Sequence, residues 1–280
     1  PNPNPDPNPS PNPNPNPDPN PSPNPNPNPD PKPNTDLLPA SWQPQDYDRA
    51  LGLAGDAVAV TVGEASYAKV NADGRTRIEG VAENYDVVTG VYEGGLRLWE
   101  ASLDLVIYLQ QAPTLRPEPT VLELGCGHGL PGIHMLLSGA DDVVFSDYNR
   151  EVLEGVTAPN VAANLRAQAQ QRRFGAATFL AGDWGHASSG LLAGRGFDVI
   201  LAAETIYTVE TLEASLRMIT THLNPGGVAY VAGKRYYFGT GGGTGQLIRT
   251  PLPPGFRVEH VKEVKDGKSN IRDIVAVWRD

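Results

Sequence analysis

From residue 120 to the end of the chain, short apolar runs alternate with longer segments whose apolar residues recur at helical spacing. The run 197–203, FDVILAA, is apolar at nearly every position, as in a strand covered on both faces. Strands separated by helices of this length form parallel sheets through right-handed crossovers. The pattern predicts strands at 120–124, 142–145, 177–181, 197–203 and 228–234, and helices at 130–138, 208–223 and, broken near Pro159, up to about 171.

The last two runs depart from this order. Residues 256–265 and 271–278 alternate apolar and polar side chains, and the turn between them carries Asp266-Gly267. An Asp-Gly pair between two alternating runs is typical of a β-hairpin, in which no helix separates the strands. The predicted fold class is therefore α/β: a Rossmann-like, doubly wound, mostly parallel sheet whose C-terminal hairpin strand is antiparallel to its neighbours.

The chain before residue 120 is harder to interpret. Residues 95–111 form one predicted helix, because their apolar positions recur at helical spacing and Pro113 ends the pattern. Residues 36–89 give weaker signals, a strand near 58–62 and a turn at 71–74. A further turn is predicted at 224–227, NPGG, where it leads into the strand 228–234.

The first 33 residues have proline at every odd position, with Asn, Asp, Ser or Lys between. Such a segment has no apolar side chain to bury and lacks every second N–H, so we expect an extended or disordered tail. It is either a spacer or a ligand for a proline-binding module. The predicted organisation is a Pro-Asn tail at 1–35, an N-terminal extension at 36–90 and a main domain at 91–280.

The formal net charge of −10 argues against an extended nucleic-acid surface and favours a small-molecule site or a basic protein partner. Cys126 is the single cysteine, and the histidines lack metal-ligand spacing, so neither disulfides nor a metal site is expected. No apolar run is long enough to cross a bilayer, and no signal peptide is seen. We expect a monomer in the cytoplasm or nucleus. The chain begins without methionine, and a fragment of a longer protein is one interpretation of that start.

The turn after the first predicted strand is rich in glycine and favours a bound ligand. In an open parallel sheet, ligands bind beyond the carboxyl ends of the strands. The glycines allow the chain to pass close to a ligand, although glycines that serve only as turns remain an alternative. A literal G-x-G-x-x-G at 127–132 indicates a dinucleotide, whereas the frame Glu123-x-Gly125-x-Gly127-x-Gly129 places an acid before the first glycine. A carboxylate there suits the ammonium of a methionine moiety and would repel a pyrophosphate.

Acidic residues follow the next two strands as well. Asp147 can accept hydrogen bonds from ribose hydroxyls under either interpretation. Asp183 suits an adenine amino group, and Trp184 beside it can stack on a ring. Together with Glu123, these residues favour S-adenosylmethionine over a dinucleotide.

Four motifs carry a family resemblance: VLELGCGHGLPGI at 121–133, SDYN at 146–149, GDW at 182–184 and AETIY at 203–207. They resemble those of class I, seven-strand methyltransferases. A Trp-Glu pair at Trp99-Glu100 and the segment KRYYFGTGGG at 234–243 narrow the resemblance to the histidine protein methyltransferase homologs. It covers roughly residues 92–280. His128 departs from the small residue expected inside the turn.

The resemblance implies methyl transfer from S-adenosylmethionine to a histidine nitrogen of a protein, in that family a large-subunit ribosomal protein. No membrane and no direct nucleic-acid contact is implied. Residues expected to bind the cofactor are Leu98, Trp99 and Glu100 at its methionine end, Gly125 at the turn, Asp147, Tyr148 and Asn149 at the ribose and adenine edge, Asp183 and Trp184 beside the adenine, and Ala203 beneath it. Glu204 and Tyr207, with Tyr237 and Gly241 in the loop 236–243, are expected to face the substrate.

Glu204 is the candidate catalytic residue. A histidine acceptor, with a usual pKa of about 6.5, is largely neutral near pH 7, so its site mainly has to select the tautomer. A carboxylate that accepts the hydrogen bond of the non-reacting N–H would do this and would favour the cationic methylated product. Alternatively, Glu204 is only a charge at the start of the following helix. Lysine methylation, a nicotinamide-dependent oxidoreductase and a non-catalytic cofactor-binding protein are the rival functions.

Overall fold

The computed structural model describes residues 57–71, 76–79, 81, 86–88, 90–113, 116–168, 174–185, 190–267 and 270–280. All of them belong to one compact unit, residues 33–280. The Pro-Asn tail and most of the turn predicted at 71–74 lie outside the described residues. The division of the chain at residues 35 and 90 stays a prediction.

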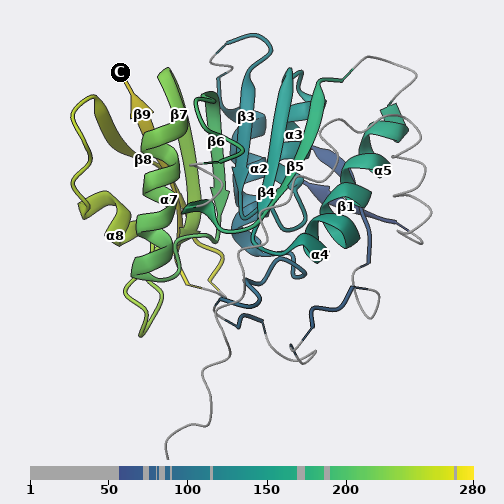
Figure 1. Ribbon diagram of the computed structural model, residues 1–280, viewed down its shortest axis with the longest axis horizontal. Helices are drawn as coiled ribbons and strands as arrows, with labels where there is room; N and C mark the ends of the chain where they lie inside the picture. The colour runs from purple at the N-terminus through teal and green to yellow at the C-terminus, as the bar shows by residue number, and fades with distance from the viewer. Residues whose placement is uncertain are drawn as a thin grey trace, which may run out of the picture. The chain divides into compact units, whose positions relative to one another are not determined.

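A seven-stranded sheet is the centre of the fold (Figure 1). Its strand order is β5-β4-β3-β6-β7-β9-β8. The five strands from β3 to β7 pair in parallel, whereas β9 is antiparallel to both of its neighbours. The strands are β3 (Thr120–Leu124), β4 (Asp142–Asp147), β5 (Ala176–Ala181), β6 (Phe197–Ala203), β7 (Leu223–Lys234), β8 (Phe256–Val264) and β9 (Arg272–Arg279). The predicted fold class is confirmed, including its C-terminal hairpin.

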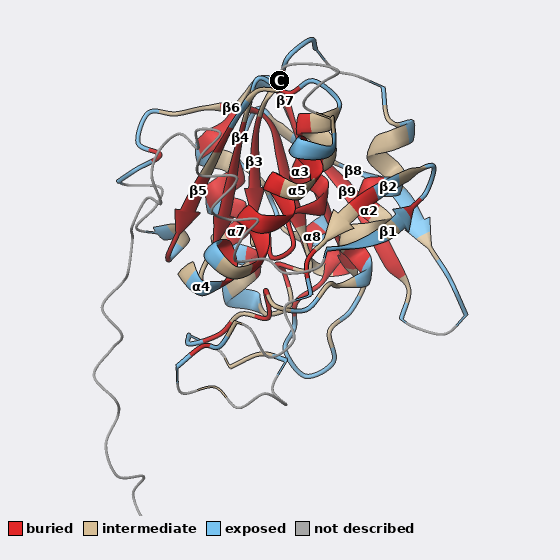
Figure 2. Ribbon diagram, turned by 90° about the vertical axis from the view of Figure 1, so that its right-hand side faces the viewer, coloured by how far each residue is buried: buried red, intermediate tan, exposed pale blue. Residues whose placement is uncertain are grey.

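Helices cover both faces of the sheet, so the central strands are buried throughout (Figure 2). Successive strand residues point to opposite faces. Val121 accordingly packs in the apolar cluster with α2 (Glu100–Gln111), α3 (Leu130–Leu137) and α5 (Ala158–Gln168), while Leu122 packs in the cluster with α7 (Val209–His222) and α8 (Thr244–Arg249). Burial on both faces explains why the strands read as continuous apolar runs.

Three predicted boundaries were wrong. The helix predicted at 95–111 begins at Glu100, because Gly94 has a φ of 86° and Trp99 is extended. Residues 224–227 belong to β7, where the pairing with β6 shifts register, rather than to a separate turn. The helical region does not break at Pro159, which lies inside α5. It follows α4 (Arg150–Val152) and widens instead into a π-helical turn, Leu153–Thr157, just before α5. Proline removes one N–H from the helix, and the wider turn accommodates that loss.

A two-stranded hairpin, β1 (Val58–Val62) and β2 (Ala65–Lys69), packs against α5; only its first strand was predicted. The Asn164 amide accepts a hydrogen bond from Ala68 N–H (2.9 Å) and donates one to Ala68 O (2.7 Å). Asn160 accepts one from Val70 N–H (2.7 Å) and donates one to His128 O in the Gly-rich turn (2.9 Å). Asn160 therefore links the hairpin to that turn. Among the described residues, no helix combines the length and apolar character that a bilayer crossing requires.

Candidate active site

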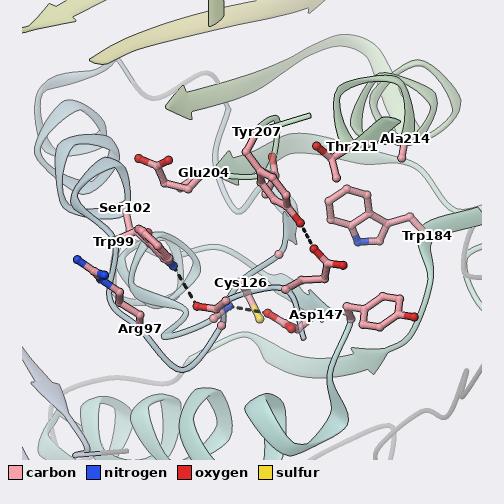
Figure 3. A pocket seen from close by; sticks show the side chains of 18 of the residues that line it. Arg97, Trp99, Ser102, Cys126, Asp147, Trp184, Glu204, Tyr207, Thr211 and Ala214 are labelled. Atoms are coloured by element: carbon pink, nitrogen blue, oxygen red, sulfur yellow. Dashed lines mark hydrogen bonds between the residues drawn. The ribbon is translucent and has the colours of Figure 1, made fainter. Parts of the chain in front are cut away.

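A cavity of about 370 Å³ lies beyond the carboxyl ends of the parallel strands (Figure 3). Its walls come from the Gly-rich turn after β3, the ends of β4, β5 and β6, the loop 90–99 and the start of α7. Trp99 and Glu204 lie toward one side of it and Trp184 toward the other (Figure 3). Its size is within the range of small-molecule sites. The cavity is therefore the candidate active site.

Close packing requires the glycines of the turn. Gly125, Gly127 and Gly129 have φ values of 57°, 49° and 69°, in the left-handed region that favours glycine. A Cβ on Gly127 would lie 3.2 Å from the carbonyl oxygen of Gly95, where the loop crosses the turn. A Cβ on Gly132 would lie 2.5 Å from both the Glu123 carboxylate and the Phe145 ring. Gly132 is thus required by packing under α3 and does not line the cavity, which gives the G-x-G-x-x-G frame no ligand contact there.

Asp147 organises the turn from the end of β4. Its side chain is buried and accepts hydrogen bonds from Gly127 N–H (2.9 Å) and Asn149 N–H (3.1 Å). Burial raises the pKa of Asp147 to about 6, although both hydrogen bonds act in the opposite direction. The carboxylate lines the cavity and keeps further lone pairs for a ligand hydroxyl.

The Glu123 side chain does not lie in the cavity, where the sequence suggested that it would meet a ligand ammonium. It is buried and does not line the cavity, and its Oε2 accepts a hydrogen bond from Gly132 N–H at 2.9 Å. Burial raises the pKa of Glu123 to about 8. The contact that the structure gives Glu123 is with the start of α3, and binding of a ligand ammonium stays a prediction.

The raised pKa gives a testable pH dependence. Since the folded pKa of Glu123 is about 8 and the usual value is 4.5, the folded protein retains a proton at neutral pH that the unfolded chain has released. The contribution of Glu123 to stability is then greatest at low pH and falls as pH rises from about 4.5 to about 8. Glu123→Gln keeps an acceptor for Gly132 N–H but cannot titrate. Its melting temperature, followed by circular dichroism, is expected to fall less than that of the wild type between pH 6 and pH 9. Parallel curves for the two proteins would contradict this expectation.

Most of the other residues expected to bind the cofactor line the cavity, and two of them do not. Leu98, Trp99, Tyr148, Asp183, Trp184 and Ala203 line the cavity with Gly125 and Gly127, whereas Glu100 and Asn149 do not. Glu100 is exposed at the first turn of α2. Asn149 is buried, donates to Val91 O (2.8 Å) and accepts from Glu93 N–H (3.2 Å), so it fixes the loop that forms one wall.

A second cavity of about 290 Å³ adjoins the first and shares Glu93, Trp99, Glu204 and Tyr207 with it. Its remaining walls come from Val87, Asn270, Lys234 at the end of β7, and the segment after β7, with Tyr236, Tyr237, Phe238 and Thr240. Of the expected substrate-facing residues, Tyr207 and Tyr237 line this cavity. Gly241 does not; it bridges to Thr208 at the start of α7.

Glu204 lies where the two cavities meet. It has a φ of 57°, an uncommon conformation for a residue other than glycine, and its N–H donates to Ala232 O at 2.9 Å. Strained conformations of this kind cluster at functional sites. The α7 helix begins at Val209 behind a Thr208 capping box, so Glu204 is not a charge at its N-terminus.

Two tyrosines hold two carboxylates in this region. Tyr237 Oη donates to Glu204 Oε2, and Tyr207 Oη donates to Glu93. The other oxygen, Glu204 Oε1, is buried and has no hydrogen-bond partner in the part of the chain that the structure describes. Burial raises the pKa of the Glu204 carboxyl, while the Tyr237 hydroxyl and the Lys234 charge lower it. A buried acceptor oxygen without a partner is suited to an N–H donor from a bound group.

Three residues without a role assigned from the sequence also line the first cavity: Glu93, Arg97 and Thr205. Glu93 lies before the predicted helix in a segment without periodicity, Arg97 lies within the segment 95–111 that was predicted as helix, and Thr205 lies within the motif at 203–207. Thr205 is buried, and its hydroxyl has no hydrogen-bond partner within the described ranges of the chain. Among the described residues there is no cluster of His, Cys, Asp and Glu able to hold a metal ion.

Comparison with known proteins identifies the family of this chain. The sequence model of the lysine methyltransferase family matches residues 87–237, which contain both the Gly-rich turn and Tyr237. The chain belongs to this family. A histidine protein methyltransferase 1 homolog of Dictyostelium discoideum is 38% identical over 71% of this chain and 62% of its own length. Histidine protein methyltransferase 1 of Schizosaccharomyces pombe is 33% identical over 69% of this chain and 67% of its own length.

The chain spans from about half to about two-thirds of the length of the curated relatives that it matches. Among solved structures, magnesium protoporphyrin IX methyltransferase of Synechocystis PCC 6803 with bound S-adenosylmethionine has 18% identity and a TM-score of 0.46, over 63% of this chain and 77% of that chain.

The methyltransferases of this family use S-adenosylmethionine, and the chemistry of the first cavity fits that cofactor. Its charged lining consists of Glu93, Asp147, Asp183, Glu204 and Glu210 against Arg97 and Arg217. An excess of carboxylates attracts a sulfonium cation and disfavours the pyrophosphate of a dinucleotide. The two carboxylates at the ends of β4 and β5, with Trp184 beside them, suit the hydroxyl groups and the ring of a nucleoside.

Proposed function

We propose that this protein transfers a methyl group from S-adenosylmethionine to a ring nitrogen of a histidine in a protein substrate. The proposal rests chiefly on Glu204 Oε1, a buried oxygen without a partner at the junction of the two cavities. The relatives named as histidine protein methyltransferases support it. In this proposal the first cavity takes the cofactor and the second takes the acceptor side chain.

The bound cofactor supplies an electrophilic methyl carbon on a sulfonium. Asp147 would hold its ribose, Asp183 and Trp184 its adenine, and Trp99 its methionine end. In-line transfer depends mainly on alignment of the nucleophile and exclusion of water, which the enclosed junction of the cavities favours.

Glu204 orients the acceptor ring through a hydrogen bond and later accepts its proton. Its Oε1 accepts the hydrogen bond of the non-reacting ring N–H, which leaves the other nitrogen with a free lone pair aimed at the first cavity. Tyr237 holds the carboxylate through Oε2, and burial raises the pKa of Tyr237, so its hydroxyl remains a donor. As the methyl–nitrogen bond forms, the carbon–sulfur bond of the sulfonium would break, and the sulfur would leave as a neutral thioether with the electron pair of that bond. The positive charge is then on the ring, and the proton on its other nitrogen passes to the ionised Glu204 carboxylate.

The substrate is proposed to be a basic protein, and a large-subunit ribosomal protein in particular. The chain carries a net charge of −10, which favours a basic partner. Phe238 is 84% exposed and Tyr236 is 50% exposed at the second cavity, so they offer aromatic contacts to an approaching polypeptide.

Lysine methylation is the second candidate, because the family whose model matches is described as lysine methyltransferase. A lysine acceptor has a usual pKa of about 10.4, so it must lose a proton before attack. Glu204 is also the group in position to receive that proton. The two candidates are distinguished by the identity of the modified residue.

Incubation with labelled S-adenosylmethionine and purified large-subunit ribosomal proteins, followed by mass mapping, tests the proposal. We expect the label on a histidine ring nitrogen and none with an Asp147→Ala variant, in which the cofactor turn loses its anchor. Label confined to lysine would overturn the histidine assignment. Cofactor binding without any label would indicate a binding protein instead.

A further inference from the structure

The second cavity contains a lysine of its own. Lys234 ends β7, and its Nζ lies 5.9 Å from the centre of the Trp99 ring and 5.4 Å from the centre of the Tyr237 ring. Both rings line the cavity, as does Lys234 itself. A single ammonium group therefore lies within cation–π reach of both aromatic side chains.

The surroundings of this ammonium are those that would bind a substrate ammonium. The cavity lining combines the Glu93 and Glu204 carboxylates with the rings of Trp99, Tyr207 and Tyr237. Aromatic rings with nearby carboxylates are the usual means of recognising lysine-like cations. Here Lys234 already satisfies them, and its charge would repel a second ammonium.

A histidine acceptor meets no such obstacle. Near pH 7 an imidazole is largely neutral, whereas a lysine side chain is almost entirely protonated. Repulsion from Lys234 therefore acts against a lysine and leaves a neutral ring unaffected. Glu204, whose carboxylate the Lys234 charge also influences, stays available to the ring N–H.

We propose that Lys234 is the residue that excludes lysine from this acceptor site, because its ammonium occupies the position between Trp99 and Tyr237 that a substrate ammonium would take. The inference rests on the proposed function in one respect, namely that the second cavity receives the acceptor. According to this inference, Lys234 alone decides whether the site takes a neutral or a cationic nitrogen acceptor.

The first experiment measures how tightly a small cation binds between Trp99 and Tyr237, and it involves no methyl transfer. Tetramethylammonium chloride is titrated into the full chain at constant ionic strength, and the indole N–H signal of Trp99 is followed by NMR, assigned with Trp99→Phe. In Lys234→Met, which retains an apolar stem of similar length, we expect tetramethylammonium to bind about 10-fold more tightly than in the wild type. Lys234→Arg, which keeps a cation there, is expected to resemble the wild type.

The second experiment measures specificity. Degenerate peptide libraries with a fixed central histidine or a fixed central lysine are methylated with labelled S-adenosylmethionine. The lysine-to-histidine ratio of initial rates is expected to rise about 10-fold in Lys234→Met and to stay unchanged in Lys262→Met, which removes an exposed positive charge from β8.

The outcomes separate the two proposals. If the wild type labels lysine in preference to histidine, the proposed function fails, whatever tetramethylammonium does. If the wild type labels histidine, but Lys234→Met neither binds tetramethylammonium more tightly nor raises the ratio while its melting curve matches the wild type, the role of Lys234 is overturned. If Lys234→Met unfolds, the Lys234→Gln variant supplies the same two readouts.

Discussion

Replacing Glu204 by glutamine is expected to lower the rate of methyl transfer on the order of 10²- to 10³-fold, with the affinity for S-adenosylhomocysteine unchanged within a few-fold. The amide still accepts the Tyr237 hydrogen bond, so the local structure is preserved. It cannot take up the ring proton or stabilise the cationic product. The loss corresponds to about 3–4 kcal/mol of transition-state stabilisation.

The pH dependence of the rate is a second readout of the same substitution. Burial raises the pKa of Glu204, and the reaction requires its ionised form. The wild-type rate is therefore expected to fall as pH drops through this raised pKa. In Glu204→Gln that ionisation is absent, and only the titration of the acceptor histidine remains in the profile.

The measurement is kcat for the mapped substrate against pH, with calorimetry for the cofactor product. Glu213→Gln is the matched control, because Glu213 is on α7 with its side chain 65% exposed and does not line either cavity. A Glu204→Gln variant with full activity and unchanged choice of ring nitrogen would refute the role given to Glu204.

Replacing Asp104 by alanine is expected to destabilise the fold by about 3 kcal/mol. Asp104 on α2 pairs with Arg272 at the start of β9, with an Oδ2–Nε distance of 2.5 Å, and the two side chains are only 13% and 6% exposed. The substitution removes the closer of the two ion pairs that Arg272 makes with Asp104 and Asp266, and Asp266 stays at 3.1 Å from the guanidinium. Removing a close partner from a buried charge costs far more than a surface pair contributes.

Urea unfolding followed by circular dichroism measures this effect. Glu154→Ala removes one partner of Arg150, in an exposed pair four residues apart, and it is expected to cost about 0.5 kcal/mol or less. If the two variants lost similar free energies of unfolding, the buried pair would not have the importance assigned to it. Arg272 is also the register partner of Lys234 on β7. The Asp104→Ala variant is therefore expected to loosen the second cavity as well.

The sheet could be predicted because its strands are buried on both faces and read as apolar runs. What escaped prediction has local causes. Strand β2 alternates weakly, and α8 follows a run of glycines that gives no helical signal. The start of α2 was set too early because Leu96 continues the helical spacing, although the preceding glycines hold the chain in a loop.

The candidate site could be predicted only where strand ends supply it. Asp147 is the last residue of β4, and Asp183 and Glu204 lie within two residues of the ends of β5 and β6, so the topology brings the three together. Glu93 reaches the same cavity from a loop and bonds to Tyr207, a contact between residues far apart in the sequence. Such contacts leave no periodic signal. Glu123 shows the converse, since its position just before the glycine-rich turn does not reveal that its side chain turns toward α3.

The hydrogen bonds of the Asn160 amide have a consequence for where this protein can be truncated. The amide joins the backbone of the β1–β2 hairpin to the backbone of the Gly-rich turn, although no described residue of the hairpin lines the cavity. The match to the family begins only at residue 87, after the hairpin. A fragment that starts at residue 87 would keep every described residue that lines the cavity. It would lose the hydrogen bond between Val70 and Asn160, and with it a contact that supports the Gly-rich turn.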